Sequence, residues 1–387
     1  MTRVGAGPTE QAWIATANQD PGAGDHRVPS GYDALFTWHY DKGAQAGLDR
    51  LYEKAKLSMW NAKDLPWDTE VDPEVVAVAN RESMRSAGLE PDLSGTAFSS
   101  WNDDDWLRLG VEQQRWMLSQ FLHGEQGALL CTARIVETAP GIDAKYYGAT
   151  QVMDEARHIE VFSRYLDTKL GGAYPVNPHL RDLLDDIIAD RRWDMTYLGM
   201  QIMVEGLALA AFGLMHTTTT EPLLKEILRR VMADEARHVA FGVLALKDAY
   251  AQMSASELEE RAEFAYEAAV RMRDRLQSQE VWQRLGVPVA QAIELINLSP
   301  ERQLFQQLLF AKIVPNCAKL GLLDANSGWL RERFTDLGVI AFEHTTDTPE
   351  EQEAFAVAGY QDERCYFDCS SSKSAGQRHQ PGMNLSK

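Results

Sequence analysis

Two stretches of the sequence, GEQGALLCTARIVETAPGIDAKYYGATQVMDEARH at 124–158 and EGLALAAFGLMHTTTTEPLLKEILRRVMADEARH at 205–238, end in the same pentapeptide. The two copies of DEARH begin at Asp154 and Asp234, so they lie 80 residues apart (234 − 154). Within each copy, Glu and His are three positions apart, and side chains at that spacing share one face of a helix. The repeated pair indicates a duplicated helical unit.

Each pentapeptide also has a partner glutamate upstream, at the same distance in both copies. That distance is 30 residues (155 − 125 and 235 − 205), so the pattern Glu-x29-Glu-x-x-His occurs twice. We therefore expect two helical hairpins, each with one glutamate on its first helix and a Glu/His pair on its second. The six candidate side chains are Glu125, Glu155, His158, Glu205, Glu235 and His238.

The sequence around these motifs is almost continuously helix-forming from Asp104 to about Phe334. Pro, Gly, Ser and Thr mark the breaks between helices, and convincing strand-like alternation is lacking. Four long helices with apolar stripes are expected at about 104–138, 143–170, 179–216 and 222–252. The predicted fold class is therefore all-α, built on a four-helix bundle with additional N- and C-terminal helices.

In an antiparallel bundle, the six side chains converge at one level of the core. Four carboxylates buried together without counter-ions are costly, because each ion loses several kcal/mol on leaving water. Two divalent cations balance the four negative charges, and oxygen and imidazole ligands suit iron or manganese. The repeated pattern therefore predicts a dinuclear carboxylate site. The alternative is a solvated ion pair in each copy, or a duplication that has lost its metals.

Composition and charge exclude several classes of protein. The chain has 387 residues, 45% of them apolar, and a formal charge of −19, which repels nucleic acids and anionic membranes. No apolar stretch of about 18 residues is free of charges, so we expect no membrane span. The N-terminus lacks the apolar core of a signal peptide, and four cysteines cannot form a disulfide framework for this length. We expect a cytoplasmic protein.

Four regions are expected along the chain. Trp38, Trp60 and Trp67 are the expected anchors of a helical layer before the bundle, because tryptophan buries a large area. After the bundle we expect two or three further helices and then a polar tail. The boundaries are 1–103 for the N-terminal arm and Trp-rich layer, 104–253 for the di-metal bundle, 254–342 for the C-terminal helices and 343–387 for the acidic and polar tail.

On these motifs, residues from about 104 to 250 resemble the ferritin-like di-iron carboxylate superfamily. DEARH is similar to the signature of the hydroxylase subunits of bacterial multicomponent monooxygenases, and the EG that opens EGLALAAF (205–212) is shared with ribonucleotide reductase small subunits. The resemblance implies that the six candidate residues bind two iron ions per chain, with a mixed manganese/iron pair as a second option. It also implies that Asp154 and Asp234 orient the ligand imidazoles, across the bundle. Alternatively, they pair with Arg157 and Arg237.

The chain departs from the related branches at three positions. Phe162 replaces the radical tyrosine of the reductases, and Leu209 replaces the threonine that the hydroxylases place one turn after a ligand glutamate. Proton delivery would then need another route, such as water or Thr132. Arylamine N-oxygenases of the superfamily have an additional histidine one turn before the last motif, where this chain has Val231. This difference argues against N-oxygenation of that type.

The resemblance implies a di-iron oxidoreductase, expected to be a monooxygenase, that uses O2 to oxidise a small apolar or aromatic substrate. The expected pocket residues are Leu129, Phe162, Leu209 and Phe212. Electrons are expected from a ferredoxin or reductase, because the chain has no flavin or nicotinamide motif. A homodimer is compatible with the sequence. The rival functions are a ferroxidase or another iron-handling protein, and a non-enzymatic protein with a structural metal pair.

Overall fold

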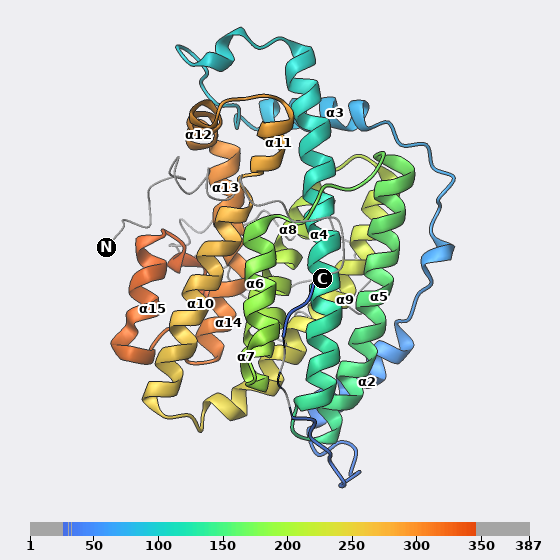
Figure 1. Ribbon diagram of the computed structural model, residues 1–387, viewed down its shortest axis with the longest axis vertical. Helices are drawn as coiled ribbons and strands as arrows, with labels where there is room; N and C mark the ends of the chain where they lie inside the picture. Colours follow the sequence, from blue (N-terminus) through green and yellow to red (C-terminus); the bar gives the residue numbers. More distant parts are fainter. Residues whose placement is uncertain (1–25, 30, 32, 346–387) are drawn as a thin grey trace, which may run out of the picture.

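The computed structural model describes residues 26–29, 31 and 33–345, and within these residues all regular secondary structure is helical (Figure 1). The expected all-α fold is confirmed. Of the predicted tail, all residues beyond 345 lie outside the described part of the chain. The elements are α2 (Ala46–Leu57), η1 (Ala62–Asp64), α3 (Pro73–Ser86), η2 (Ala97–Ser100), α4 (Asp103–Thr138), α5 (Ile142–Lys169), α6 (Pro178–Ala189), α7 (Trp193–Tyr197), η3 (Leu198–Val204), α8 (Glu205–Thr218), α9 (Pro222–Tyr250), α10 (Ala255–Arg275), α11 (Gln279–Arg284), α12 (Val289–Leu298), α13 (Pro300–Leu308), α14 (Phe310–Lys319), α15 (Ala325–Asp336) and η4 (Ile340–His344).

The bundle consists of two helical hairpins. The first joins α4 to α5 through a short turn at Gly141, whose φ of 85° suits glycine. The second joins α8 to α9, and here the side chain of Glu221 accepts hydrogen bonds from the first free N–H groups of α9, while Pro222 occupies the first helical turn. These local signals place both DEARH motifs in the middle of long helices that pack against each other.

The third bundle helix differs from the expected single helix at 179–216, and that prediction is wrong. α6 ends at Ala189, and the backbone is extended at Asp190. The Asp190 carboxylate accepts a hydrogen bond from the backbone N–H of Arg192 at 2.9 Å and pairs with its guanidinium. This local ion pair stabilises a break that helical periodicity does not reveal, so α6 packs on α4 and α10 while a new helix enters the bundle.

That new helix contains one wide turn directly before a candidate ligand. Residues 198–204 form the π-helix η3, and Glu205 follows as the first residue of α8. Such π segments in longer helices are frequent at functional sites. The run Trp193–Thr218 has a mean hydropathy of 1.6 and passes a length-and-composition test for a membrane span, but 78% of its apolar window is buried inside the protein. This burial is that of a central core helix.

The layers on either side of the bundle differ in detail from the expectation. Trp67 is buried and Trp60 half-buried, whereas Trp38 is 71% exposed and does not anchor the layer. On the other side, α10–α15 replace the two or three helices expected, because Gly, Pro and Ser break this region into short pieces. Figure 1 shows α10, α14 and α15 on the side of α6 away from α5.

Close packing against the π segment requires a glycine in α9. A Cβ added at Gly242 would lie 2.6 Å from the Cβ of Gln201 and 3.1 Å from Ile202. In the first motif copy, the position one turn after the histidine is Phe162, which shows that the duplicated helices have different neighbours here.

We expect Gly242→Ala to destabilise the protein by about 1–3 kcal/mol, because the added methyl group overpacks the contact between α9 and η3. Gly124→Ala is the control, since a Cβ there meets nothing within 4 Å. The control should be neutral or stabilising by up to about 1 kcal/mol through helix propensity. Denaturant unfolding of both variants measures the difference, and equal stabilities would contradict the packing argument.

Candidate metal centre

The six repeated side chains meet in the core of the bundle, although they come from four different helices. Each of them is at most 5% exposed. Their potential ligand atoms form two overlapping clusters, and within each cluster the atoms lie within 4.8 Å of one another. The first cluster contains Glu125, Glu155, His158 and Glu235, and the second contains Glu155, Glu205 and His238. The repeated spacing has therefore brought all six groups to one place.

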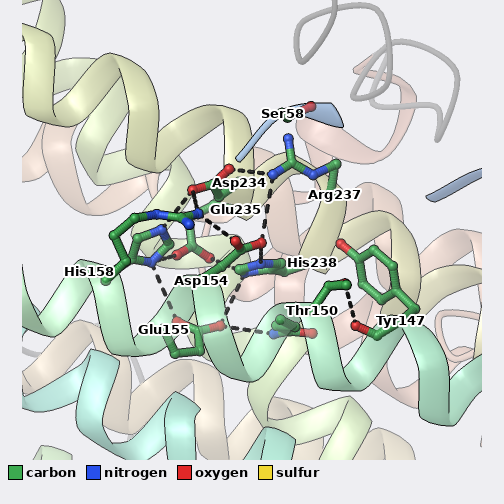
Figure 2. A network of polar contacts seen from close by, with 12 residues as sticks. Ser58, Tyr147, Thr150, Asp154, Glu155, His158, Asp234, Glu235, Arg237 and His238 are labelled. Carbon is green, nitrogen blue, oxygen red and sulfur yellow. Dashed lines mark hydrogen bonds and ion pairs between the residues drawn. The ribbon is translucent and has the colours of Figure 1, made fainter. Parts of the chain in front are cut away.

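Glu155 and Glu235 lie between the two histidines, as Figure 2 shows. Glu155 places one oxygen 3.1 Å from Nδ1 of His238 and the other 3.4 Å from Nδ1 of His158. Glu235 does the same, at 3.2 Å from Nδ1 of His158 and 3.5 Å from Nδ1 of His238. Each of these carboxylates thus bridges the two imidazoles, with one oxygen beside each.

Glu125 and Glu205 occupy the two outer ends of the cluster. Glu125 lies 3.2 Å from Nδ1 of His158. Glu205 accepts a hydrogen bond from Gln151 at 2.9 Å, and the same amide also donates to Glu155 at 3.0 Å. The His158 side therefore gathers the carboxylates of Glu125, Glu155 and Glu235, whereas the His238 side gathers those of Glu155 and Glu205. Glu235 reaches the second imidazole only at 3.5 Å.

The chemistry of these atoms fits a pair of divalent ions. Oε2 of Glu155, of Glu205 and of Glu235 is buried without a hydrogen-bond partner in the described structure. Burial raises the pKa of Glu205 well above its ordinary value, and the nearby charge of Glu155 raises it further. Unpaired carboxylate oxygens facing one another at this depth are costly unless cations lie between them. The donor set therefore fits a metal pair, although the role of each residue as a ligand remains a prediction.

Protons hold the cluster together when cations do not. Burial alone would lower the pKa of His158, but the charge of Glu125 and hydrogen bonds to carboxylates raise it well above its ordinary value. Burial would raise the pKa of Glu155, yet the charge of His238 holds it well below. Binding of metals must release these protons, so the metal affinity of the site should increase as the pH rises.

The far side of each imidazole contacts an aspartate from the opposite hairpin. Nε2 of His158 lies 3.2 Å from Asp234, and Nε2 of His238 lies 3.3 Å from Asp154 (Figure 2). Nδ1 is consequently the nitrogen that faces the carboxylates. Such outer carboxylates fix the orientation of a ligand imidazole and raise its basicity.

The same aspartates also pair with arginines, so the two interpretations of Asp154 and Asp234 are compatible. Arg157 donates to Asp234 at 3.0 Å and contacts Asp154, and Arg237 pairs with Asp234. Burial would raise the pKa of Asp234, but His158 and the two guanidinium groups hold it well below the ordinary range. The two arginines neutralise the two aspartates. The negative charge that is not balanced by these arginines therefore belongs to the four glutamates of the cluster.

Two contacts of the site were not predicted from the sequence. Gln151 lies one turn before Glu155, where an ordinary helical glutamine carries no recognisable signal. Trp60 was expected only as a packing anchor, yet its indole N–H donates to Asp234 at 2.8 Å and its ring lies 4.6 Å from the Arg157 guanidinium carbon. Trp60 thus connects the partly exposed layer to the His158 side of the cluster.

Of the four expected pocket residues, three are buried and Leu129 is not. Phe162 and Phe212 are fully buried with ring centroids 5.7 Å apart, and Phe121 lies 4.5 Å from Phe212. Leu209 is also buried, one turn after Glu205. Leu129 is only half-buried, because the buried face of α4 continues from Glu125 through Ala128 and Thr132. Phe121 was missed because the expected stripe on this helix was drawn through neighbouring leucines.

Replacing either bridging glutamate should reduce metal binding. We expect two metal ions per chain in the wild-type protein and markedly fewer in Glu155→Ala and Glu235→Ala, because each removes an oxygen from both half-sites. Glu160→Ala, at an exposed position of the same helix α5, is the control and should keep full occupancy. Elemental analysis of purified protein measures the ratio, and full occupancy in the two site variants would refute the assignment.

The aspartates should affect reactivity more than occupancy. Asp154→Asn and Asp234→Asn should retain most of the metal but slow the reaction with O2 by about 10–100-fold, because an amide stabilises the metal-bound imidazole less. Asp194→Asn breaks a buried pair with Arg261 outside the site and should lower stability without slowing that reaction. Stopped-flow rates equal to wild type in both site variants would show that the aspartates only form ion pairs with Arg157 and Arg237.

A family model and several solved structures are similar to this chain. The model described as P-aminobenzoate N-oxygenase AurF matches residues 129–321, which are 193 residues (321 − 129 + 1) or just under half of the chain. Two R2-like ligand-binding oxidases, one with a metal cofactor after photoconversion and one with a Mn/Fe cofactor after a long soak, are 16% and 17% identical to it. Their TM-scores are 0.48 and 0.47, and each match covers 72% of this chain and 94% of the oxidase. The comparison with curated proteins gives no match.

The matched family segment contains every residue of the cluster except Glu125, which precedes it by four positions (129 − 125). The family match is to an oxygenase, and the buried carboxylates and imidazoles could hold the metal ions that such chemistry uses. Together they identify the chain as an oxygen-activating oxidoreductase of the ferritin-like di-iron carboxylate superfamily.

Proposed function

We propose that this protein is a di-iron monooxygenase that inserts oxygen from O2 into a small apolar or aromatic substrate, with a mixed manganese/iron pair as a second option. The observation that carries the proposal is the pair of buried imidazoles with the carboxylates of Glu155 and Glu235 between them. When bound, a redox-active metal pair supplies the electrons and the Lewis acidity that O2 reduction requires. Residues of the chain hold the metals, shape the pocket and deliver protons.

The surroundings of the cluster favour an apolar substrate. The rings of Phe121, Phe162 and Phe212 pack against one another, and Phe162 lies one turn after His158 on α5. Leu209 has the same relation to Glu205 on α8. Aromatic and aliphatic side chains at these positions exclude water, which protects a reactive oxygen species and disfavours charged substrates.

Thr132 supports a route for protons that replaces the threonine missing at position 209. It lies on the buried face of α4, seven residues and therefore about two turns after Glu125. Its side chain is fully buried, and Oγ1 has no hydrogen-bond partner in the described structure. We assign Thr132 a relay role: its hydroxyl passes its proton toward the cluster and takes one from a water molecule, so the hydroxyl is restored.

Electrons are proposed to come from a separate ferredoxin or reductase. Trp60 is half-buried and contacts Asp234, which contacts His158, so a continuous chain of hydrogen-bonded groups joins the surface layer to the cluster. Leu57 and Met59 beside it are 87% and 55% exposed, which offers an apolar contact for a donor protein. A cytoplasmic location and a homodimeric assembly complete the proposal.

N-oxygenation of an arylamine is the second candidate, because the matching family model carries that activity in its description. The additional histidine of that class corresponds here to Val231, which is fully buried and cannot bind a metal. In the first motif copy the equivalent position is Gln151 (231 − 80), whose amide contacts two carboxylates. The two copies therefore differ at the position where an extra ligand would stand.

Anaerobic loading with Fe(II), followed by rapid mixing with O2, tests the proposal. We expect a transient visible absorption that decays faster when an apolar aromatic compound is present, and product that contains oxygen from labelled O2. Leu209→Thr is the matched variant, since it adds a hydroxyl beside Glu205 and should change the lifetime of the transient. Accumulation of ferric mineral would instead indicate iron storage, and the lack of any reaction would indicate a structural metal pair.

A further inference from the structure

Arg275, the last residue of α10, carries a buried guanidinium that lacks a counter-ion. Its side chain is 2% exposed, and Nε and Nη1 have no hydrogen-bond partner within the described residues. Burial lowers the pKa of Arg275 to about 10, so the group remains charged at neutral pH. An isolated charge at this depth destabilises a fold unless something binds it.

The other buried arginines of the described chain all have acidic partners. Arg157 and Arg237 pair with the aspartates beside the cluster, and Arg261, on the same helix as Arg275, pairs with Asp194 at 2.9 Å. Arg275 is the exception. Arg261 lies on the same helix and has an acidic partner, so the helix itself does not explain why Arg275 lacks one. The explanation lies in the turn that follows Arg275.

That turn has unpaired donors but its acceptors are already in use. Ser278 Oγ accepts from Gln113 at 2.7 Å, and Gln279 Oε1 accepts from Asn177 at 3.2 Å. The carboxylate of Glu280 is occupied as well, by Trp116 and Asn177 at 2.8 Å each. The amide nitrogen of Gln279 is a further buried donor without a partner in the described structure. What the turn lacks is therefore a negatively charged acceptor that is not already engaged by other donors.

We propose that the turn between α10 and α11 is a binding site for a small organic carboxylate, which the guanidinium of Arg275 holds and the amide of Gln279 assists. The guanidinium fork matches the two oxygens of a carboxylate. Arg302 also contacts this turn, but its guanidinium already donates to the carbonyl of Leu276 and, at 3.2 Å, to Ser278 Oγ. Arg275 is therefore the cation of the turn with unpaired donors, and a single cation matches a singly charged anion, whereas a phosphate dianion would need a second one. Trp282 and Leu276, both buried beside the turn, suit an apolar body attached to that carboxylate.

This site does not involve the residues of the metal cluster, so its test is independent of the proposed function. The probes are benzoate, the uncharged isostere benzamide, and inorganic phosphate. We expect benzoate to raise the melting temperature of the wild-type protein, benzamide to leave it unchanged, and phosphate to have a weaker effect than benzoate. Titration calorimetry then gives the affinity for benzoate in each variant.

Arg275→Met should weaken benzoate binding at least about tenfold, the usual effect of losing a charge-assisted contact. Without ligand, it should melt at or above the wild-type temperature, because the substitution removes an unpaired buried charge. Arg261→Met is the control on the same helix: it should melt lower, because Asp194 loses its partner, and still bind benzoate.

Three outcomes would overturn the proposal. Benzoate binding that is unchanged in Arg275→Met would place the anion elsewhere. Loss of benzoate binding in Glu155→Ala would show that the carboxylate binds at the metal cluster. Phosphate binding that is stronger than that of benzoate and is lost in Arg275→Met would make this a site for inorganic anions. Benzoate binding retained in Glu155→Ala and lost in Arg275→Met would support the proposal.

Discussion

Four carboxylates buried at one level of a helical bundle are the constraint on which the rest of this structure depends. They have to be neutralised by cations or by protons, since water does not reach them. The outer aspartates do not add to the problem, because Arg157 and Arg237 balance them. The negative charge that remains belongs to the four glutamates, and two divalent ions match it. Metal binding and folding are therefore coupled in this chain.

The duplicated hairpins are equivalent in their ligands and different in their surroundings. Gln151 in the first copy corresponds to Val231 in the second, and Phe162 corresponds to Gly242. The first difference places an amide beside one terminal carboxylate, and the second lets the π segment approach α9. Symmetry is thus kept where the metals need it, and it is broken where the two sides of the cluster face different neighbours.

The π segment joins the packing of the core to the geometry of the site. A wide turn displaces the side chains that precede Glu205, and it brings Gln201 against α9 at the one position that has no Cβ. Gln201 itself is fully buried, and neither end of its amide has a partner in the described residues. A wide turn that leaves polar atoms unpaired is costly, and proteins retain such features mainly next to functional groups.

The sequence by itself determined the helical class, the two hairpins and the six residues that meet in the core. A repeated spacing of Glu and His residues places them on matching helix faces, whatever the packing around them. The tertiary structure alone decided that Glu155 and Glu235 lie between the two imidazoles, and that each aspartate contacts an imidazole and an arginine at once. It also decided the break at Asp190, the exposure of Trp38 and the position of Phe121. These features depend on contacts between residues far apart in the chain. Helical periodicity indicates which residues share a face of a helix, but it does not indicate which other elements that face packs against.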